Sequence, residues 1–295
     1  MKYPIELEIT DYCGLKCFYC PNKDFKEKGI MKSEDFYNII DYIYRNIDNI
    51  SFLDLSGIWD IFLHPNIIDF LKYLSKKFSS TWFEILISTK GVSVTDEHIS
   101  ILKSLYKDGL KFNLSVWIYS VVKKNHDYLS WVKSFDNIIW FIKRIKKEWL
   151  PFSLELLINN YSVNELKYFY ELWNALGVKY KIHNLHNFWG SIKLNWEDKF
   201  NDIKNYKLKW SFREDIEENN KLYWFDFYCR YFMPLISRDA FLYLCSHSWK
   251  QEKFRWEKIS LLMKKYPNYI DMLGYVMKNL NKNICKNCNY LNYNK

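Results

Sequence analysis

Seven cysteines carry the most specific chemical information in this 295-residue chain. They fall in two groups: Cys13, Cys17 and Cys20 have the spacing CxxxCxxC, and the later group is Cys229, Cys245, Cys285 and Cys288. An odd number of cysteines argues against a complete set of internal disulfides. Thiolates are the ligands that zinc and iron–sulfur clusters prefer, so both groups predict metal or cluster sites.

The number of thiolates in each group separates the possible sites. Structural zinc takes four ligands in tetrahedral geometry, and the first group supplies three. A cubane cluster held by three cysteines leaves one iron able to bind a small molecule. The second group supplies four cysteines, which is enough to close a site. A zinc site with a distant cysteine or histidine is the alternative for the first group, and a zinc site in the C-terminal region for the second.

Hydrophobic periodicity predicts elements that alternate between strand and helix over the first part of the chain. The predicted strands are 5–9, 50–55, 83–88, 111–116, 154–158 and 179–182. The predicted helices begin at Ser33 and cover 67–77, 95–107, 135–147 and 163–176. Such alternation implies a parallel sheet with right-handed crossovers, in which ligands bind at the carboxyl edge of the strands.

The alternation stops near residue 184, and the remaining chain holds the four later cysteines. A short strand is expected at 241–244, running into Cys245, and a helix at 256–265. The region has few long apolar stripes, so a small domain stapled by a cluster fits it. We therefore predict two domains, 1–184 and 185–295.

The first cysteine group resembles the signature of radical S-adenosylmethionine (SAM) enzymes, because CxxxCxxC follows a short strand and includes an aromatic residue, Tyr19. The resemblance implies an α/β fold, an open partial (βα)6 TIM-like barrel. It also implies a [4Fe-4S] cluster on Cys13, Cys17 and Cys20 that binds SAM, with Tyr19 near the cofactor. The C-terminal region resembles the twitch domain, a shortened relative of the SPASM domain. Its four cysteines imply one auxiliary [4Fe-4S] cluster.

The segment 56–65 resembles the family pattern Ser-Gly-x-Gly-Glu-Pro-x-x-His-Pro, whose backbone and acid hold the amino group of SAM. Gly57, His64 and Pro65 match the pattern. Asp60 stands where glutamate is usual, and Trp59 replaces a glycine. An aspartate can accept from an ammonium through a shorter arm. The resemblance thus implies Gly57 and Asp60 as cofactor-binding residues, and a loop acid or turn former is the alternative for Asp60.

Three further segments resemble cofactor-binding positions of the family. Ser88 and Thr89 begin a stretch close to Ser-Thr-Asn-Gly, in which Lys90 replaces asparagine, and they are candidates for contacts to the SAM carboxylate or ribose. Ser115 matches a strand serine that faces the ribose. Asn187 lies in a segment that resembles a recurring Asn-Trp-x-Gly. Ordinary strand-end turn chemistry is the alternative for Ser88 and Thr89, and a plain strand serine is the alternative for Ser115.

The resemblance implies an enzyme that reductively cleaves SAM to a 5′-deoxyadenosyl radical, which abstracts a hydrogen atom from its substrate. If both clusters form, all seven cysteines are ligands and none remains as a hydrogen donor. This favours net oxidation, such as dehydrogenation of a small sugar, aminocyclitol or nucleoside. A maturase that cross-links or epimerises a ribosomally made peptide is the alternative, although strand one starts by residue 5, so no leader-binding module is expected. A zinc-binding protein without enzymatic activity is a third interpretation.

Composition sets the expected surroundings of this enzyme. The formal net charge is +9, yet the sequence has no dense basic run, which argues against a nucleic-acid partner. No apolar run approaches the ~18 residues of a membrane span, and no signal peptide is recognisable. Open iron–sulfur sites need a reducing interior, so we expect the cytoplasm, with an external one-electron donor such as flavodoxin or ferredoxin.

Overall fold

A computed structural model places most of the first 184 residues and two later segments. It describes residues 2–17, 20, 22, 27–57, 59–158, 162–184, 234–243 and 255–278. Within these ranges, one nine-stranded sheet has the order β6-β5-β4-β3-β2-β1-β7-β8-β9. The first six strands are β1 (Tyr3–Leu7), β2 (Ile50–Leu55), β3 (Glu84–Thr89), β4 (Phe112–Ile118), β5 (Phe152–Ile158) and β6 (Lys179–Asn184). Each pairs in parallel with the next, as the sequence predicts.

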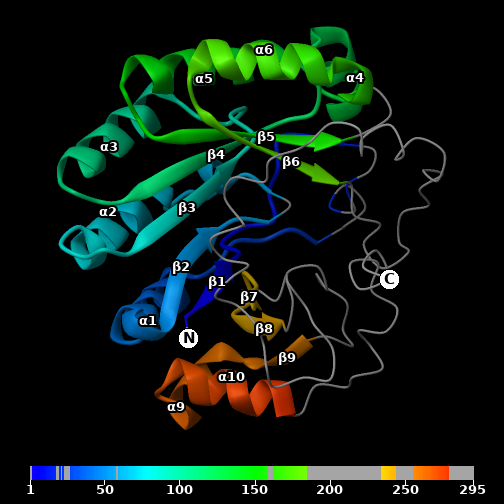
Figure 1. The fold of residues 1–295 in the computed structure, drawn as a ribbon. Helices are drawn as coiled ribbons and strands as arrows, with labels where there is room; N and C mark the ends of the chain where they lie inside the picture. The colour runs from blue at the N-terminus through cyan, green and yellow to red at the C-terminus, as the bar shows by residue number, and fades with distance from the viewer. Residues whose placement is uncertain are drawn as a thin grey trace.

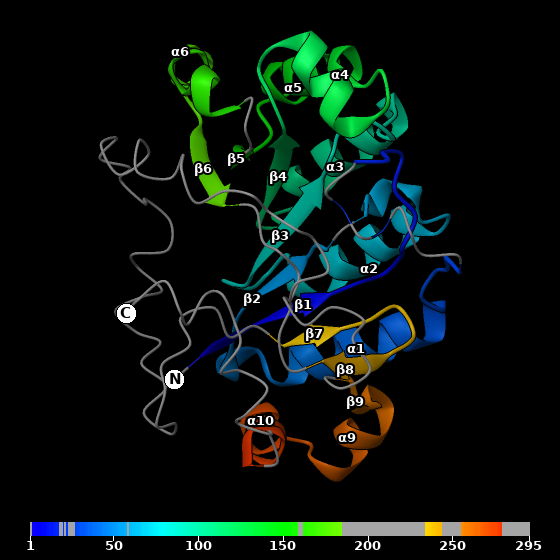
Figure 2. The same cartoon turned by 90° about the vertical axis from the view of Figure 1, so that its right-hand side faces the viewer.

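Helices connect these strands and lie along the outer side of the curved sheet (Figures 1 and 2). They are α1 (Ser33–Arg45), α2 (Ile67–Phe78), α3 (Asp96–Lys107), α4 (Lys123–Ser130), α5 (Phe135–Lys147) and α6 (Leu166–Leu176). The short helix α4 has no counterpart among the predicted helices, and the first turn of the helix predicted at 163–176 is the 3-10 helix η4 (Ser162–Glu165). Six parallel strands, of which each of the first five is followed by a helix, form an open sheet in the described residues and confirm the predicted α/β partial barrel.

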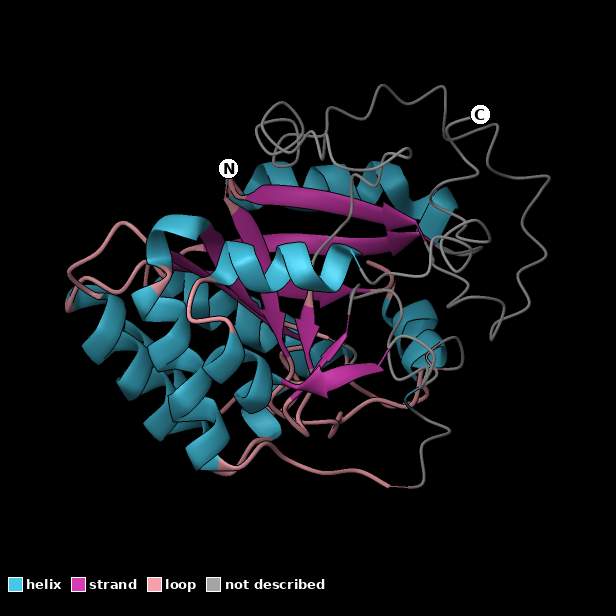
Figure 3. Ribbon diagram, turned by 90° about the horizontal axis from the view of Figure 1, so that it is seen from below, coloured by secondary structure: helices cyan, strands magenta, loops and turns pink. Residues whose placement is uncertain are grey.

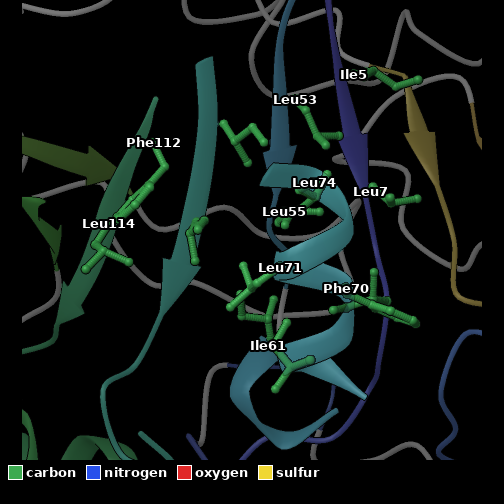
Figure 4. Close-up of a cluster of buried hydrophobic side chains, with 14 of the residues drawn as sticks. Ile5, Leu7, Leu53, Leu55, Ile61, Phe70, Leu71, Leu74, Phe112 and Leu114 are labelled. Atoms are coloured by element: carbon green, nitrogen blue, oxygen red, sulfur yellow. The ribbon is translucent and has the colours of Figure 1, made fainter. Parts of the chain in front are cut away.

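The core lies between the outer face of the sheet and the helices, and Figure 4 shows part of it. Alternate residues of β1, Ile5 and Leu7, are fully buried there, while Glu6 between them faces the opposite side. The α2 side chains Phe70, Leu71 and Leu74 repeat at helical spacing and are also fully buried. Burial of each such side chain contributes about 1.5–3 kcal/mol, so this layer fixes the strands that carry the site.

The opposite face of the sheet is polar, because the residues between the apolar ones carry hydroxyl and charged groups. Ser88, Ser115 and Ser153 are register partners across β3, β4 and β5. One step nearer the carboxyl ends, Trp117 pairs in register with Glu155. The parallel register thus gathers polar side chains from distant parts of the sequence on one face.

The sheet continues beyond β1 into the C-terminal part of the chain. Strand β7 (Leu235–Ile236) pairs in parallel with β1, and β8 (Phe241–Tyr243) and β9 (Arg255–Lys258) follow in antiparallel order. Figure 3 shows the strands from below, and their hydrogen-bonded order joins those of the barrel and of this extension in one sheet. The described segments of the predicted second domain therefore share a sheet with the barrel.

Two helices close this extension, and their limits differ from the sequence prediction. The helix predicted over 256–265 is wrong in its first turn, because residues up to Lys258 pair with β8 as β9. Helix α9 (Ile259–Lys265) starts only after the Ile259 amide donates to the Ala240 carbonyl oxygen at 2.8 Å. Helix α10 (Tyr269–Lys278), which the sequence analysis did not include, follows it. No helix in the described ranges is both long and apolar enough to cross a membrane.

Candidate functional site

The first three cysteines lie on a loop that leaves the carboxyl end of β1. Backbone hydrogen bonds close the base of this loop, from the Asp11 amide to the Gly29 carbonyl oxygen at 3.0 Å and from the Met31 amide to the Ile9 carbonyl oxygen at 2.7 Å. The Thr10 hydroxyl also donates to the Gly29 carbonyl oxygen, at 3.3 Å. The two ends of the loop are therefore joined to each other just beyond the carboxyl end of β1.

The three thiols lie close together in a sparsely solvated place. Cys17 is 4% exposed and packs with Leu15, Tyr119 and Leu129, with Cys13 and Cys20 beside this cluster. Burial raises the pKa of all three thiols. For Cys17 and Cys20 the charges of neighbouring thiols add to this effect, and the pKa reaches about 12 for Cys17 and about 11 for Cys20. Three thiolates at this place therefore need a positive partner, which an iron–sulfur cluster supplies.

The donor set fits a cluster bound through three separate irons. In the described residues, no group of three histidine, cysteine, aspartate or glutamate side chains converges tightly enough to hold one metal ion. In a cubane each cysteine binds a different iron, so the three sulfurs need not converge on one point. The sulfur chemistry and the burial thus match the group that the sequence resemblance implies.

Gly57 and Trp59 shape the loop that follows β2. Gly57 has φ +139°, a conformation that favours glycine, and a Cβ atom there would lie 1.3 Å from the Trp59 ring. Trp59 is itself buried, so its indole ring packs directly against the Gly57 backbone. The tryptophan that departs from the family pattern thus fills the space beside the predicted cofactor-binding glycine.

Asp60 is fully buried and joins three segments. Its Oδ1 atom accepts from the Thr89 hydroxyl at 2.9 Å and from the Phe62 amide at 3.3 Å, which caps the 3-10 helix η3 (Ile61–Leu63). Its Oδ2 atom accepts from the Lys90 amide at 3.3 Å. The Asp60 amide donates to the Tyr12 carbonyl oxygen at 3.0 Å. Asp60 therefore links the loop after β2, the end of β3 and the cysteine loop.

The polar residues at the ends of β3 and β4 have different environments. The Thr89 hydroxyl donates to Asp60 and accepts from the Gly91 amide at 2.9 Å, so its hydrogen is already used. Ser88 and Ser115 are 7% exposed and face each other in register on the polar side of the sheet. The structure thus brings Asp60 and Thr89 together, and Ser88 beside Ser115.

Lys90 is the residue of this site that sequence reasoning did not select. Its side chain is 7% exposed, and its Nζ atom lies 4.5 Å from the centre of the Trp117 ring. Burial lowers the pKa of Lys90, while the charges of Cys13, Asp60 and the other two thiols raise it. The signal in the sequence was the lysine at a position where the family pattern has asparagine.

His64 positions the chain on the far side of the cysteine loop. Its Nε2 atom donates to the Met31 carbonyl oxygen at 3.1 Å, and its Nδ1 atom accepts from the Asn66 amide at 3.1 Å. Burial lowers the pKa of His64, which favours this neutral form. The histidine of the matched pattern therefore acts as a structural bridge from the loop after β2 to the segment that follows the cysteines.

Several predicted residues lie outside the described ranges. They are Tyr19, Asn187, Cys229, Cys245, Cys285 and Cys288. The second cluster and the roles given to Tyr19 and Asn187 stay predictions.

Sequence comparisons find partial relatives among curated proteins. The chain is 31% identical over 117 residues to the tungsten-containing aldehyde ferredoxin oxidoreductase cofactor-modifying protein of Pyrococcus furiosus, covering 39% of this chain and 31% of the relative. It is 30% identical over 131 residues to the antilisterial bacteriocin subtilosin biosynthesis protein AlbA of Bacillus subtilis, covering 43% of this chain and 27% of the relative. The matches thus span less than a third of either relative.

Solved structures resemble the whole chain in fold. Streptococcus suis SuiB bound to SAM superposes with a TM-score of 0.69 at 13% identity, covering 98% of this chain and 72% of SuiB. The protein anSMEcpe with bound SAM superposes with a TM-score of 0.67 at 15% identity, covering 98% of this chain and 86% of anSMEcpe. BtrN in complex with SAM and 2-DOIA superposes with a TM-score of 0.51 at 14% identity, covering 99% of this chain and 92% of BtrN.

The model of one family matches the region that carries the cysteine loop and the strands around it. It is described as the radical SAM superfamily, and it covers residues 7–172, more than half of the chain. The chain belongs to the radical SAM superfamily.

Proposed function

We propose that this protein binds a [4Fe-4S] cluster through Cys13, Cys17 and Cys20 and uses it to generate a radical from SAM. The observation that carries the proposal is the gathering of one buried and two half-buried thiols beside the polar ends of β3 and β4. When bound, the cluster supplies the electron that cleaves SAM into methionine and a 5′-deoxyadenosyl radical, which takes a hydrogen atom from a substrate carbon.

The residues of the chain hold and shield these groups. Leu15 and Leu129 cover Cys17 and keep water from the thiols, which protects a radical from side reactions. Ser88 and Ser115 offer hydroxyl groups to the ribose or carboxylate of SAM. Gly57 and Asp60 are proposed at its amino group. Asp60 also holds the end of β3 in place, so its loss would disturb the site in two ways.

A polar substrate suits the sheet face next to this site. Glu155 is almost fully buried there, and its Oε1 atom accepts from the Ser153 hydroxyl at 3.1 Å and lies 3.6 Å from the Lys181 Nζ atom. The Ser153 hydroxyl also accepts from the Asn113 amide group at 3.0 Å. The polar surface formed by Asn113, Ser153, Glu155 and Lys181 can hydrogen-bond to a substrate rich in hydroxyl and amino groups. We therefore propose net oxidation of a small sugar, aminocyclitol or nucleoside.

A peptide maturase is the second candidate, and the relatives favour it. One matched SuiB structure is bound to the precursor peptide SuiA, and one anSMEcpe structure holds the Cp18Cys peptide. The curated relative AlbA belongs to bacteriocin biosynthesis. The same polar surface of the sheet can also bind peptide amides, so cross-linking or epimerisation of a peptide is the alternative.

The later cysteines and the electron balance of the reaction support proposals for a second cluster, an electron donor and a cellular compartment. Cys229, Cys245, Cys285 and Cys288 would hold an auxiliary [4Fe-4S] cluster in a twitch-like region, which accepts the electron of the substrate radical. A flavodoxin or ferredoxin would reduce the first cluster. Both clusters need the reducing conditions of the cytoplasm.

Metal analysis together with one cysteine variant tests the proposal. After anaerobic reconstitution we expect about eight irons per chain, two cubanes of four. With dithionite and SAM, the protein forms 5′-deoxyadenosine, and Cys17→Ala abolishes this product while keeping about four irons. Zinc in place of iron, or 5′-deoxyadenosine formation that survives Cys17→Ala, would contradict the proposal.

The two substrate classes can be separated by the same product. Substrate accelerates formation of 5′-deoxyadenosine, so aminocyclitols, nucleosides and short peptides are compared as added compounds. Stimulation by a deuterated small polyol with transfer of deuterium into 5′-deoxyadenosine supports the first candidate. Transfer from a peptide supports the second.

A further inference from the structure

Lys90 has a buried ammonium group that lies over an aromatic ring. In the described part of the chain its Nζ atom makes neither a hydrogen bond nor an ion pair, and it lies 4.5 Å from the Trp117 ring centre. A cation over an aromatic face gains about 0.5–2 kcal/mol, which offsets little of the cost of removing an ammonium from water. An anion bound next to the Lys90 ammonium group would offset the remainder of this cost.

The backbone fixes where this ammonium can reach. The Lys90 amide donates to Asp60, and the preceding Thr89 hydroxyl donates to the same carboxylate, so the end of β3 is held at two adjacent residues. The electrostatic neighbours of the Lys90 side chain include Cys13, Cys17 and Cys20. The ammonium therefore lies on the side of the sheet where the three thiols gather.

The Asp60 carboxylate does not satisfy the Lys90 ammonium group. Asp60 lies close by, but its oxygens accept from Thr89, Phe62 and the Lys90 backbone, and no ion pair reaches the Lys90 Nζ atom. Thr89 donates its only hydroxyl hydrogen to Asp60, which leaves it no donor for a second carboxylate. Of the two neighbours on this strand end, Lys90 is thus the one that can donate to an anionic ligand.

We propose that Lys90 receives the carboxylate of the methionyl part of SAM at the three-cysteine site. This inference rests on the proposed function, because it assumes that SAM is bound there. Lys90 then takes the contact that the sequence resemblance gave to Ser88 and Thr89, and Thr89 acts through Asp60 as a positioning residue. A charge-assisted hydrogen bond at a buried site makes this a binding contact for SAM.

The experiment measures binding without turnover. Wild type, Lys90→Met and Lys90→Arg are reconstituted anaerobically, and the dissociation constants of SAM and of decarboxylated SAM are measured by equilibrium dialysis without reductant. For Lys90→Met we expect SAM binding to weaken about tenfold to a hundredfold. Decarboxylated SAM, which lacks the carboxylate, keeps its affinity, and Lys90→Arg keeps much of the affinity for SAM.

Matched controls separate a local effect from a general one. Lys111→Met removes an exposed lysine at the opposite end of β4 and leaves both dissociation constants unchanged. Iron content and circular dichroism establish that each variant is folded and loaded. If Lys90→Met fails to load, Lys90→Asn, with the residue of the family pattern, takes its place in the comparison.

The other outcomes overturn the inference in distinguishable ways. An equal loss for SAM and decarboxylated SAM, or no loss for either, shows that Lys90 does not bind the carboxylate. A shift in the reduction potential of the cluster at unchanged SAM affinity assigns the lysine charge to the thiolates instead. If loaded wild type does not bind SAM at all, the proposed function fails together with the inference.

Discussion

His126 shows how one buried side chain makes the stability of this fold depend on pH. It lies on α4, where its Nδ1 atom accepts from the Tyr119 amide at 3.4 Å and its ring stacks on the Tyr119 ring. Burial lowers the pKa of His126 to about 4, although the charges of Asp127 and Glu165 oppose this shift. The neutral ring is therefore part of the packed structure beside the cysteine site.

We predict that His126 causes the protein to lose stability in mild acid. The unfolded chain binds a proton at the ordinary pKa of about 6.5, whereas the folded chain resists protonation until about pH 4, so stability falls as pH falls through this window. Between pH 6.5 and 5 the loss is about 2 kcal/mol. Urea unfolding at several pH values measures it, and His126→Phe flattens the profile. An equal slope in that variant would assign the pH effect to other groups.

Residue identities at the site were predictable from spacing, but their partners were not. Cys13, Cys17 and Cys20 are close in sequence, so their CxxxCxxC spacing alone predicts that they bind one ligand together. Asp60 and Thr89 are 29 positions apart, and their hydrogen bond depends on how β2 and β3 pair. The role of Lys90 depends on its burial against Trp117, which no local pattern reveals.

At the scale of elements, the turn between β7 and β8 is tied to the base of the cysteine loop. The Arg238 guanidinium forms an ion pair with the fully buried Asp11 carboxylate. The Arg238 amide approaches the Glu8 carboxylate at 3.5 Å. A Cβ atom on Gly29 would lie 1.8 Å from the Arg238 Nη1 atom, so this glycine leaves the room that the arginine occupies.

We predict that Arg238→Met destabilises the fold by about 3 kcal/mol, because it removes the Arg238 cation from beside the buried Asp11 carboxylate. It should also lower the amount of cluster bound by the first three cysteines. Urea unfolding and iron content measure the two effects. The control is Arg144→Met, whose partner Asp96 is exposed, and we expect a loss below about 1 kcal/mol. Equal losses in the two variants would contradict a special role for Arg238.

Long periodic elements were predictable, whereas elements defined by pairing were not. Helix α5 has the predicted limits because its apolar stripe is regular. Strand β9 has only four residues, and it is a strand because β8 offers it a partner. The partner, and hence the end of β9 at Lys258, is decided by tertiary structure.

At the scale of the molecule, Asn46 joins the first helix to the C-terminal helices. Its side-chain amide donates to the carbonyl oxygens of Tyr42 at 3.0 Å and Pro267 at 3.1 Å. Its Oδ1 atom accepts from the Tyr269 amide at 2.8 Å. The Tyr269 hydroxyl in turn donates to the carbonyl oxygen of Pro4 at 3.1 Å. These contacts connect regions about 220 residues apart in sequence.

We predict that Asn46→Ala weakens the barrel and the C-terminal extension together, by about 2–3 kcal/mol, because buried backbone groups lose their partners. Near-ultraviolet circular dichroism and hydrogen exchange in α10 should report one common transition. Asn66→Ala, which removes a hydrogen bond to Ser33 at the surface, should cost less than about 1 kcal/mol. Separate transitions in the Asn46 variant would mean that the extension folds on its own.

The position of β1 has a consequence for how the protein is made. This strand lies between β2 and β7, so its second neighbour is a segment synthesised more than two hundred residues later. The cation that neutralises Asp11 at the base of the cysteine loop arrives with that segment. Pairing over such a separation is slow, and it can begin only after the ribosome has released residue 238. We therefore expect the three-cysteine site to reach its final form well after its own cysteines have been synthesised, because the Arg238 contact to the base of the loop forms only then.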